Sequence, residues 1–410
     1  MQTHLADFIR DTPEGREADA ILRKCVHCGF CTATCPTYQL LGDELDGPRG
    51  RIYLIKQVLE GAPVTAKTQV HLDRCLSCRS CETTCPSGVQ YGRLADIGRG
   101  IVESKVGRSA FAGAQRAGLR AVLPYPARFG PLLAIGRALR PFLPGALRSK
   151  IPPLRAAPAW PAPRHARRML VHEGCVQPAL VPNIDVATAR VLDRVGITLV
   201  RAAQPGCCGA VSYHLNAQAD GLDFMRRRID AWWPAIESGV EAIVSTASGC
   251  GVTVREYGHL LAADAAYRDK AARVSALCRD VSEVVSAEAD PIAARLRPQA
   301  EKPVIAFHSP CSLQHGLQLK GGVETLLARL GFTLTTVPDP HLCCGSAGTY
   351  SLLQPQIAEE LRLRKLAALT SGAPQMIATA NIGCLTHLAG GTSIPVRHWI
   401  EVLDAHLAGA

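Results

Sequence analysis

One string of cysteines occurs twice near the N-terminus and constrains the fold more than any other feature. It reads C-x2-C-x2-C-x3-C-P, and its copies place cysteines at Cys25, Cys28, Cys31 and Cys35, and again at Cys75, Cys78, Cys81 and Cys85. Three closely spaced thiolates can wrap one face of an iron–sulfur cubane, whereas the fourth cysteine of such a run reaches the other cluster. The spacing therefore predicts one [4Fe–4S] cluster on Cys25, Cys28, Cys31 and Cys85, and a second on Cys75, Cys78, Cys81 and Cys35.

Zinc is the alternative metal for these cysteines, because C-x2-C pairs also build structural zinc sites. A zinc ion needs only four ligands, and two identical strings with eight cysteines exceed that need. We therefore favour iron–sulfur clusters and expect residues 1–110 to form an α-helical ferredoxin domain around them.

The stretch between the two strings predicts a helix. Gly47-Pro48-Arg49-Gly50-Arg51 is followed by apolar residues at helical spacing, and Asp46 is a candidate cap just before it. Arg49 and Arg51 could neutralise cluster charge or bind a partner, or they could simply be solvated.

Length and composition favour several domains in a reducing compartment. The chain has 410 residues, of which 47% are hydrophobic. Its first 20 residues are rich in charge and lack the apolar segment of a signal peptide. No apolar run approaches the roughly 20 residues that span a bilayer. Cluster ligands must stay reduced. We expect a cytoplasmic protein that is soluble or peripheral on the inner face of the cytoplasmic membrane.

The net charge of +10 comes from one part of the chain. Residues 111–170 hold eleven Arg and Lys and no Asp or Glu, and ten prolines fall between residues 111 and 168. Motifs for binding nucleic acid are missing, so the charge favours contact with an anionic membrane surface or an acidic partner subunit. We interpret residues 111–166 as a basic, Pro-rich helical linker; a plain connector between domains is the alternative.

A second internal repeat follows this linker. In its first copy Cys175 precedes Cys207-Cys208-Gly209 by 31 intervening residues, and Cys250 comes later. In its second copy Cys311 precedes Cys343-Cys344-Gly345 by the same 31 residues, and Cys384 comes later. Glu283 and Glu401 fall in matching closing helices. These correspondences indicate two duplicated domains, residues 167–300 and 301–410.

Each copy alternates strand-like and helical runs. In the first copy these runs are Met169–His172, Asp185–Val195, Ile197–Arg201, Ala219–Ser238 and Ala242–Ser245. The pattern predicts a parallel sheet covered by helices, with the cysteines near the C-terminal ends of strands, where open α/β sheets bind ligands. The fold class is therefore α+β multidomain, with a helical domain followed by two α/β domains.

Each copy supplies four thiols, enough for one cluster or one metal ion. The candidate ligands are Cys175, Cys207, Cys208 and Cys250 in the first copy, and Cys311, Cys343, Cys344 and Cys384 in the second. His172 and His308 occupy matching positions and are either donors to these ligands or ordinary core residues. Cys278 has no counterpart and is expected to be an inert core thiol. Dinucleotide, P-loop and Ser/His/Asp signatures are absent, so we expect the chain to carry electrons rather than make bonds.

Together these motifs resemble the Cys-Cys-Gly-domain iron–sulfur oxidoreductases, and within them the iron–sulfur subunits of bacterial glycolate oxidases. The resemblance covers essentially the whole chain and rests on the cysteine strings and the stretches Leu41–Arg51, Asp230–Pro234, Thr246–Cys250 and His341–Tyr350. It implies an electron-transfer subunit of a membrane-associated complex that oxidises glycolate to glyoxylate, with D-lactate as a second substrate. It also implies FAD-binding partner subunits that hold the substrate site, no catalytic residue in this chain, and a quinone or another electron acceptor.

One departure from the family concerns the second repeat. Relatives with unusual clusters end each copy in C-x2-C, but Ala247 and Asn381 stand at the first of those positions. An ordinary four-thiolate site is therefore expected in place of a five-cysteine cluster. Two other functions stay open: an iron–sulfur subunit acting on glycerol 3-phosphate or lactate, and a non-catalytic metal-binding redox protein.

Overall fold

The structure, a computed structural model, describes all of residues 1–410 except 143, 145–150, 155, 298–300 and 408–410. Its contacts divide the chain into two compact units. The first consists of Met1–Ala117 with His341–Lys365, and the second of Gly118–Pro340 with Leu366–Ala410.

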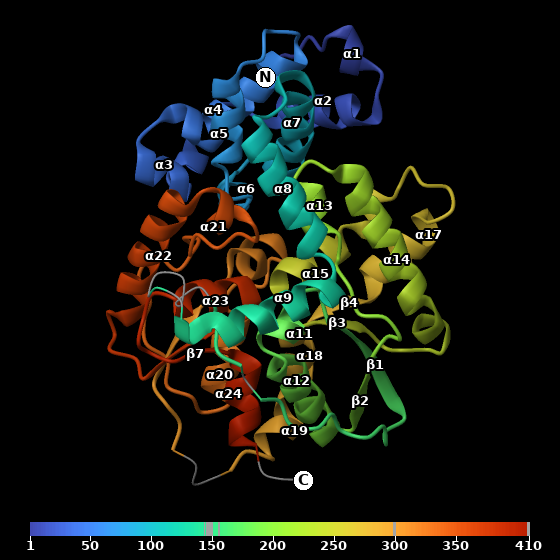
Figure 1. Ribbon diagram of the computed structural model, residues 1–410, viewed down its shortest axis with the longest axis vertical. Helices are drawn as coiled ribbons and strands as arrows, with labels where there is room; N and C mark the ends of the chain where they lie inside the picture. Colours follow the sequence, from blue (N-terminus) through green and yellow to red (C-terminus); the bar gives the residue numbers. More distant parts are fainter. Residues whose placement is uncertain (143, 145–150, 155, 298–300, 408–410) are drawn as a thin grey trace. The chain divides into compact units, whose positions relative to one another are not determined.

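The first unit is helical, which confirms the expectation for the region of the cysteine strings (Figure 1). Its helices are α1 (Asp7–Arg10), α2 (Pro13–Lys24), η1 (Phe30–Thr32), α3 (Pro36–Leu41), η2 (Glu44–Asp46), α4 (Pro48–Leu59), α5 (Ala66–Asp73), α6 (Ser80–Thr84), α7 (Tyr91–Val106) and α21 (Tyr350–Leu353). Helices α8 (Ala110–Val122) and α22 (Pro355–Thr370) begin in this unit and end in the second.

Helices α4 and α7 pack closely in the core of the first unit. Ile55 and Leu94 are fully buried there. Gly98 allows the close approach, because a Cβ at that position would come within 2.6 Å of the Ile55 side chain. The two helices thus fix the frame from which the cysteine-bearing loops extend.

The predicted cap of α4 is wrong. The residue at the N-cap of α4 is Gly47, and no side chain caps the helix there. Pro48 at the first helical position needs no hydrogen-bond partner for its nitrogen, so the helix begins without a side-chain cap. Asp46 is fully buried and pairs with Arg51 and Arg74 instead.

Two parallel sheets organise the second unit, as the alternating pattern predicts. One has the strand order β2-β1-β3-β4, from β1 (Arg167–His172), β2 (Ile197–Val200), β3 (Ile243–Ser245) and β4 (Cys278–Asp280). The other has the order β5-β6-β7, from β5 (Ile305–His308), β6 (Met376–Thr379) and β7 (Val396–His398).

The second unit also contains helices (Figure 1). They are α9 (Pro126–Leu139), η3 (Arg140–Phe142), α11 (Gln177–Leu180), α12 (Asn183–Arg194), α13 (Ala210–His214), α14 (Gln218–Glu237), α15 (Ser248–Arg255), α16 (Tyr257–Leu260), α17 (Arg268–Leu277), α18 (Val281–Ala287), α19 (Ala289–Ala293), η4 (Ser312–Gly316), α20 (Gly322–Arg329), α23 (Ile382–Ala389) and α24 (Trp399–His406).

The two sheets share one plan, as expected of a duplication. Strands β1, β3 and β4 correspond to β5, β6 and β7, and the counterpart of β2 is a single parallel bridge between Ile305 and Leu334. Both last strands lead into a helix with a reciprocal capping box, whose acidic member is Glu283 in α18 and Glu401 in α24. The predicted match of these two glutamates is confirmed.

Among the described residues, no helix is both long and apolar enough to cross a membrane.

Candidate metal centres

The first cysteine run encloses a pocket in the first unit. Five cysteines line it: Cys25, Cys28, Cys31 and Cys85, which the spacing assigns to one cluster, and Cys81, which it assigns to the other. Cys25 ends α2 and Cys85 ends α6, so the fourth thiol arrives from the other run. Burial and, to a smaller extent, the neighbouring thiols of Cys25, Cys85 and Cys28 together raise the pKa of the Cys31 thiol to about 11. Thiols this close together, with no disulfide among them, are a suitable ligand set for a soft metal centre.

The second run gathers the complementary set of thiols. Cys81 is buried, and burial holds its pKa well above the ordinary value. The thiols that raise this pKa further are those of Cys78, Cys75 and Cys35. Cys35 comes from the first run, so each group of neighbouring thiols includes one cysteine from the other run.

The two runs also share a backbone conformation. His27 and Gly29 have positive φ angles of 56° and 86° in the first run, and Ser77 and Arg79 have 53° and 59° at the matching positions of the second. Left-handed residues alternating with right-handed ones turn backbone N–H groups toward one side, which makes a concavity for anions and for Fe–S clusters. The Ser77 amide donates to the Cys75 sulfur at 3.4 Å. Three of these four residues are not glycine, so the strained conformation is imposed by the surrounding fold.

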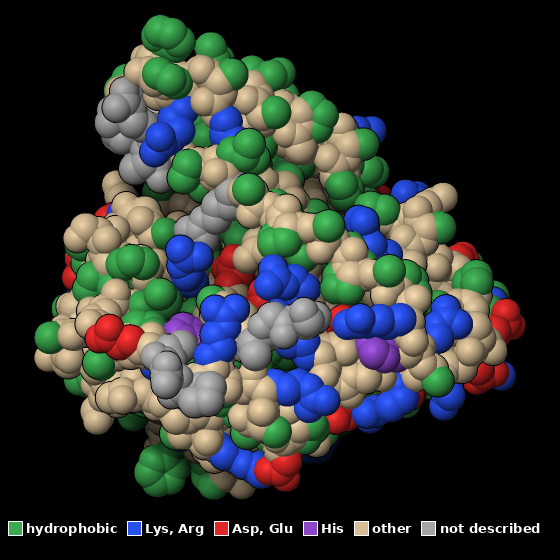
Figure 2. All heavy atoms as spheres, turned by 90° about the horizontal axis from the view of Figure 1, so that it is seen from below, with side chains coloured by type: hydrophobic (Ala, Val, Ile, Leu, Met, Phe, Trp, Pro, Cys, Tyr) green, Lys and Arg blue, Asp and Glu red, His purple; other side chains and the backbone are tan. Residues whose placement is uncertain are grey.

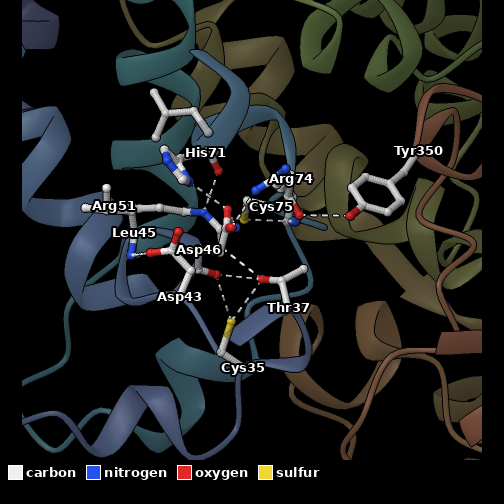
Figure 3. Close-up of polar contacts among 12 residues, drawn as sticks. Cys35, Thr37, Asp43, Leu45, Asp46, Arg51, His71, Arg74, Cys75 and Tyr350 are labelled. Carbon is white, nitrogen blue, oxygen red and sulfur yellow. Dashed lines mark hydrogen bonds and ion pairs between the residues drawn. The ribbon is translucent and has the colours of Figure 1, made fainter. Parts of the chain in front are cut away.

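A buried ionic network adjoins the second set of thiols (Figure 3). The Asp46 carboxylate is fully buried and accepts from Arg51 at 3.4 Å and from Arg74 at 2.8 Å. His71 Nδ1 lies 3.0 Å from the same carboxylate. The expectation that Asp46 caps α4 and the alternative of a solvated Arg51 are both wrong, because the two residues pair with each other inside the fold and Asp46 also pairs with His71 and Arg74, which lie 25 and 28 residues away.

Two arginines act on the Cys75 thiol. Burial alone would raise its pKa, but the guanidinium groups of Arg51 and Arg99, together with the Ser77 amide and the Tyr91 hydroxyl, outweigh that effect, and the pKa falls below its ordinary value. Arg99 was not identified from the sequence, since nothing in the spacing of α7 singles it out.

The first copy of the second repeat brings its predicted ligands together in the second unit. Ligand atoms of His172, Cys208 and Cys250 lie within 4.8 Å of one another. Contacts with Cys175 and Cys208 hold the pKa of Cys207 well above its ordinary value, and burial adds to the effect. Four thiols and one imidazole therefore converge at the ends of β1 and β3.

Local structure explains this convergence. His172 is the last residue of β1, and Cys250 lies in the first turn of α15, which follows β3. Gly209 has φ 94°, and a Cβ there would come within 2.6 Å of the Gly221 carbonyl oxygen. Its amide donates to the Cys207 sulfur at 3.3 Å. The glycine of Cys-Cys-Gly thus allows a turn that other residues cannot make.

Two aromatic residues that spacing does not reveal support this centre. The Tyr257 hydroxyl donates to the Cys208 carbonyl at 2.8 Å. The Trp232 ring packs edge-on against the His172 ring at 5.2 Å. Trp232 belongs to the Asp230–Pro234 stretch that carries the family resemblance, whereas Tyr257 lies outside every motif.

The ligands predicted in the second copy fall in different units. Cys343 and Cys344 belong to the first unit, and Cys311 and Cys384 to the second. The turn is the same as in the first copy, since Gly345 has φ 88° and donates to the Cys343 sulfur at 3.4 Å. Joint ligation by these four thiols stays a prediction.

Cys278 matches its expected role. It is buried in β4, its sulfur contacts the Gly251 carbonyl at 3.8 Å, and burial raises its pKa to about 12. A thiol with so high a pKa is almost fully protonated at neutral pH, so it is a poor nucleophile and a poor metal ligand.

Comparisons with known proteins match the chain to two domain families. Residues 21–89 match the 4Fe-4S dicluster domain family, and residues 169–255 and 305–389 match the Cysteine-rich domain family. The chain is 60% identical to the "Glycolate oxidase iron-sulfur subunit" of Escherichia coli K12 over 99% of both chains. It is 28% identical to the "Probable glycolate oxidase iron-sulfur subunit" of Bacillus subtilis 168, over 90% of this chain and 89% of that one. It is 27% identical to "Lactate utilization protein A" of Bacillus licheniformis, over 56% of this chain and 96% of that one.

Proposed function

Because the chain belongs to the family of glycolate oxidase iron–sulfur subunits, we propose that it is the electron-transfer subunit of a glycolate oxidase. The observation that carries the proposal is the pair of four-thiol sets in the first unit, each completed by a cysteine of the other run. Iron–sulfur clusters held by such sets carry single electrons. The oxidation of glycolate to glyoxylate is a two-electron reaction, so a flavin-bearing partner subunit is the natural site for it.

The proposed ligands follow the crossed assignment. Cys25, Cys28 and Cys31 hold one [4Fe–4S] cluster together with Cys85, and Cys75, Cys78 and Cys81 hold the other together with Cys35. Support comes from the shared pocket of the first set and from the mutual influence of the thiols within each set. The left-handed residues of both runs fit the group as well, because they aim backbone N–H groups at an anionic cluster.

The Cysteine-rich domains are proposed to hold further redox centres. Cys175, Cys207, Cys208 and Cys250 are the ligands in the first copy, with His172 beside them. Cys311, Cys343, Cys344 and Cys384 are the ligands in the second. In domain terms, we propose a ferredoxin domain at residues 1–110, a linker at 111–166 and two Cysteine-rich domains at 167–300 and 301–410.

The partners and acceptor follow from this role. FAD-binding glycolate oxidase subunits supply the electrons, and D-lactate is a second substrate of the complex. A membrane quinone receives the electrons, so the complex sits at the inner face of the cytoplasmic membrane. The wording of the relative's name, an iron–sulfur subunit of a glycolate oxidase, supports the partner assignment.

Surface features favour peripheral contact with that membrane. Leu132, Ile135 and Leu139 follow one another at helical spacing along α9 and are each at least 51% exposed. Basic residues flank them, and residues 111–170 contain no acidic residue. Lys and Arg side chains also gather across the middle of the face drawn in Figure 2. An apolar stripe with flanking arginines is typical of a helix that lies in the interface of an anionic bilayer.

Anaerobic purification tests the central proposal. We expect at least eight iron atoms per chain, broad visible absorption, little zinc, and bleaching when glycolate is added together with the flavin-bearing partners. One or two zinc ions without acid-labile sulfide would refute the iron–sulfur assignment. The clusters could instead resist reduction by glycolate with every flavin-bearing partner and yet be reduced by another 2-hydroxy acid or by glycerol 3-phosphate. That result would refute only the assignment of glycolate as the substrate.

A further inference from the structure

The two cysteine runs match in spacing and in backbone, but the charges around them differ. Beside the second run lie Arg51 and Arg99, whose exposed fractions are 1% and 8%. The arginine beside the first run is Arg49, whose side chain is 39% exposed and paired with Glu44 at 2.7 Å. The N-terminal ammonium of Met1 also donates to the Cys25 carbonyl, but Met1 is partly exposed as well. Water and salt screen exposed charges far more than buried ones.

Arg99 is fixed directly to the backbone of the second run. Its Nη2 atom donates to the Cys75 carbonyl at 2.5 Å, and its Nη1 atom donates to the Ser77 hydroxyl at 2.7 Å. Its remaining hydrogen bonds go to the Leu72 carbonyl at 2.9 and 3.1 Å. None of these acceptors is a carboxylate, and the acidic groups that act on Arg99, Asp96 and Asp73, do so electrostatically.

Arg51 reaches the crossing cysteine of the same set. Its Nη1 atom donates to the Thr37 hydroxyl at 3.1 Å, and that hydroxyl lies 3.3 Å from the Cys35 sulfur (Figure 3). Asp46 offsets part of this charge, but Asp46 also accepts from Arg74. Three cations, Arg51, Arg74 and Arg99, thus lie beside the Cys75 set. The carboxylate of Asp46 pairs with Arg51 and Arg74, Asp73 and Asp96 act electrostatically on Arg99, and Glu82 acts on Cys81.

We propose that Arg51 and Arg99 are positioning residues that raise the reduction potential of the centre held by Cys35, Cys75, Cys78 and Cys81. Entry of one electron adds one negative charge to that centre, with no bond formed or broken, and the electron comes from the flavin-bearing partner. Net charge is one of the factors that set the potential of an iron–sulfur centre. A nearby buried cation stabilises the added negative charge, because its field is only weakly screened. The inference rests on the proposed function.

The position of this centre suggests how a higher reduction potential would direct electron transfer. In the first unit the Tyr350 hydroxyl donates to the carbonyl of Arg74, the residue before Cys75, at 2.9 Å. Tyr350 lies six residues after Cys344 in the segment that carries Cys343 and Cys344. A higher potential at the Cys75 set draws electrons toward the side of the unit on which this segment is anchored.

The test is a redox titration of the full chain followed by EPR, with iron content measured on every sample. Arg99→Gln removes the charge but keeps a donor for the Leu72 carbonyl. We expect this variant to lower the reduction potential of the Cys75 centre by at least about 59 mV. For one electron, that change is a tenfold shift of the equilibrium toward the oxidised form. The reduction potential of the Cys25 centre should not change, and Arg99→Lys should restore the potential of the Cys75 centre to its wild-type value. Arg49→Gln is the matched control at an exposed arginine and should leave the Cys75 centre unchanged.

A second variant, with the opposite expected effect on the reduction potential, keeps the proposal testable if Arg99→Gln does not fold. Asp46→Asn removes a negative charge beside the same centre, so its potential should rise. Unchanged potentials in both Arg99→Gln and Asp46→Asn, with full iron content, would overturn the proposal and leave the proposed function standing. A wild-type chain without an EPR-active centre on the Cys75 set would instead overturn the proposed function.

Discussion

Cys85 distinguishes a crossed ligand arrangement from two local ones. Because it lines the pocket of Cys25, Cys28 and Cys31, we expect Cys85→Ser to damage the cluster of the first run and leave most of the second. EPR and iron counts on the purified chain measure this, with Cys278→Ser as a control at a buried thiol outside both sets. Damage confined to the Cys75–Cys81 centre would contradict the crossed assignment.

Asp185 links stability to pH near the first Cysteine-rich centre. It is buried, and its Oδ1 atom accepts from Gln177 at 2.9 Å and from Thr246 at 2.7 Å. Its pKa is raised to about 7, mainly by burial and also by nearby Glu173, although the two hydrogen bonds and Arg201 act in the opposite direction. The folded state therefore holds a proton that the unfolded state releases above pH 4, and the folded state loses stability as the pH rises from about 4 to about 7.

Asp185→Asn tests this linkage. The amide oxygen can accept both hydrogen bonds, and the group no longer titrates. We expect the decrease in unfolding free energy between pH 5 and 7.5 to become smaller in the variant, as measured by denaturant unfolding of anaerobic protein at several pH values. An identical pH profile in both proteins would show that Asp185 does not titrate in this range.

The turn after β2 shows why Cys-Cys-Gly requires its glycine. Both Gly209 and Gly196 have positive φ angles, 94° and 83°, but only a Cβ at Gly209 meets a backbone atom, the Gly221 oxygen at 2.6 Å. A strained backbone conformation alone costs roughly 1–3 kcal/mol. Gly209→Ala should therefore lower the unfolding free energy by more than Gly196→Ala does, and it should reduce the iron bound by the second unit. Equal losses in the two variants would show that the close approach to Gly221 is not limiting.

The regular elements could largely be predicted from the sequence, because strands and helices depend on local periodicity. The run Ala219–Ser238 became α14, and Ile197–Arg201 became β2. The charged network could not be predicted, because Asp46 pairs with Arg74 across 28 residues and no local pattern encodes that contact. Tyr257 was missed for the same reason, since 49 residues separate it from Cys208. Cysteine spacing predicted which thiols of the two runs lie near one another, because cluster geometry restricts which thiols can share a centre. That these thiols are the cluster ligands stays a prediction.

The proposed membrane contact is tested at the scale of the whole molecule, because it would require an apolar stripe and a basic surface together. The stripe on α9 consists of Leu132, Ile135 and Leu139. Replacing all three with Ser should weaken binding to vesicles that contain an anionic phospholipid, because both apolar burial and electrostatic attraction hold an interfacial helix. Arg148, another basic residue of the expected docking segment, lies outside the described residues, so the variant targets α9 alone.

Vesicle flotation with the full complex measures this binding, and Leu363→Ser provides a control at another leucine that is 51% exposed. Raising the salt should also release the wild-type complex, because the screening length falls from about 8 Å at physiological ionic strength to about 3 Å at 1 M. Neutral vesicles should bind weakly at any salt concentration.

If the triple variant floats like the wild type but loses its flavin-bearing partners, the α9 surface binds those partners instead of lipid. If it keeps both, residues 111–166 are a connector, and the membrane must contact another part of the complex.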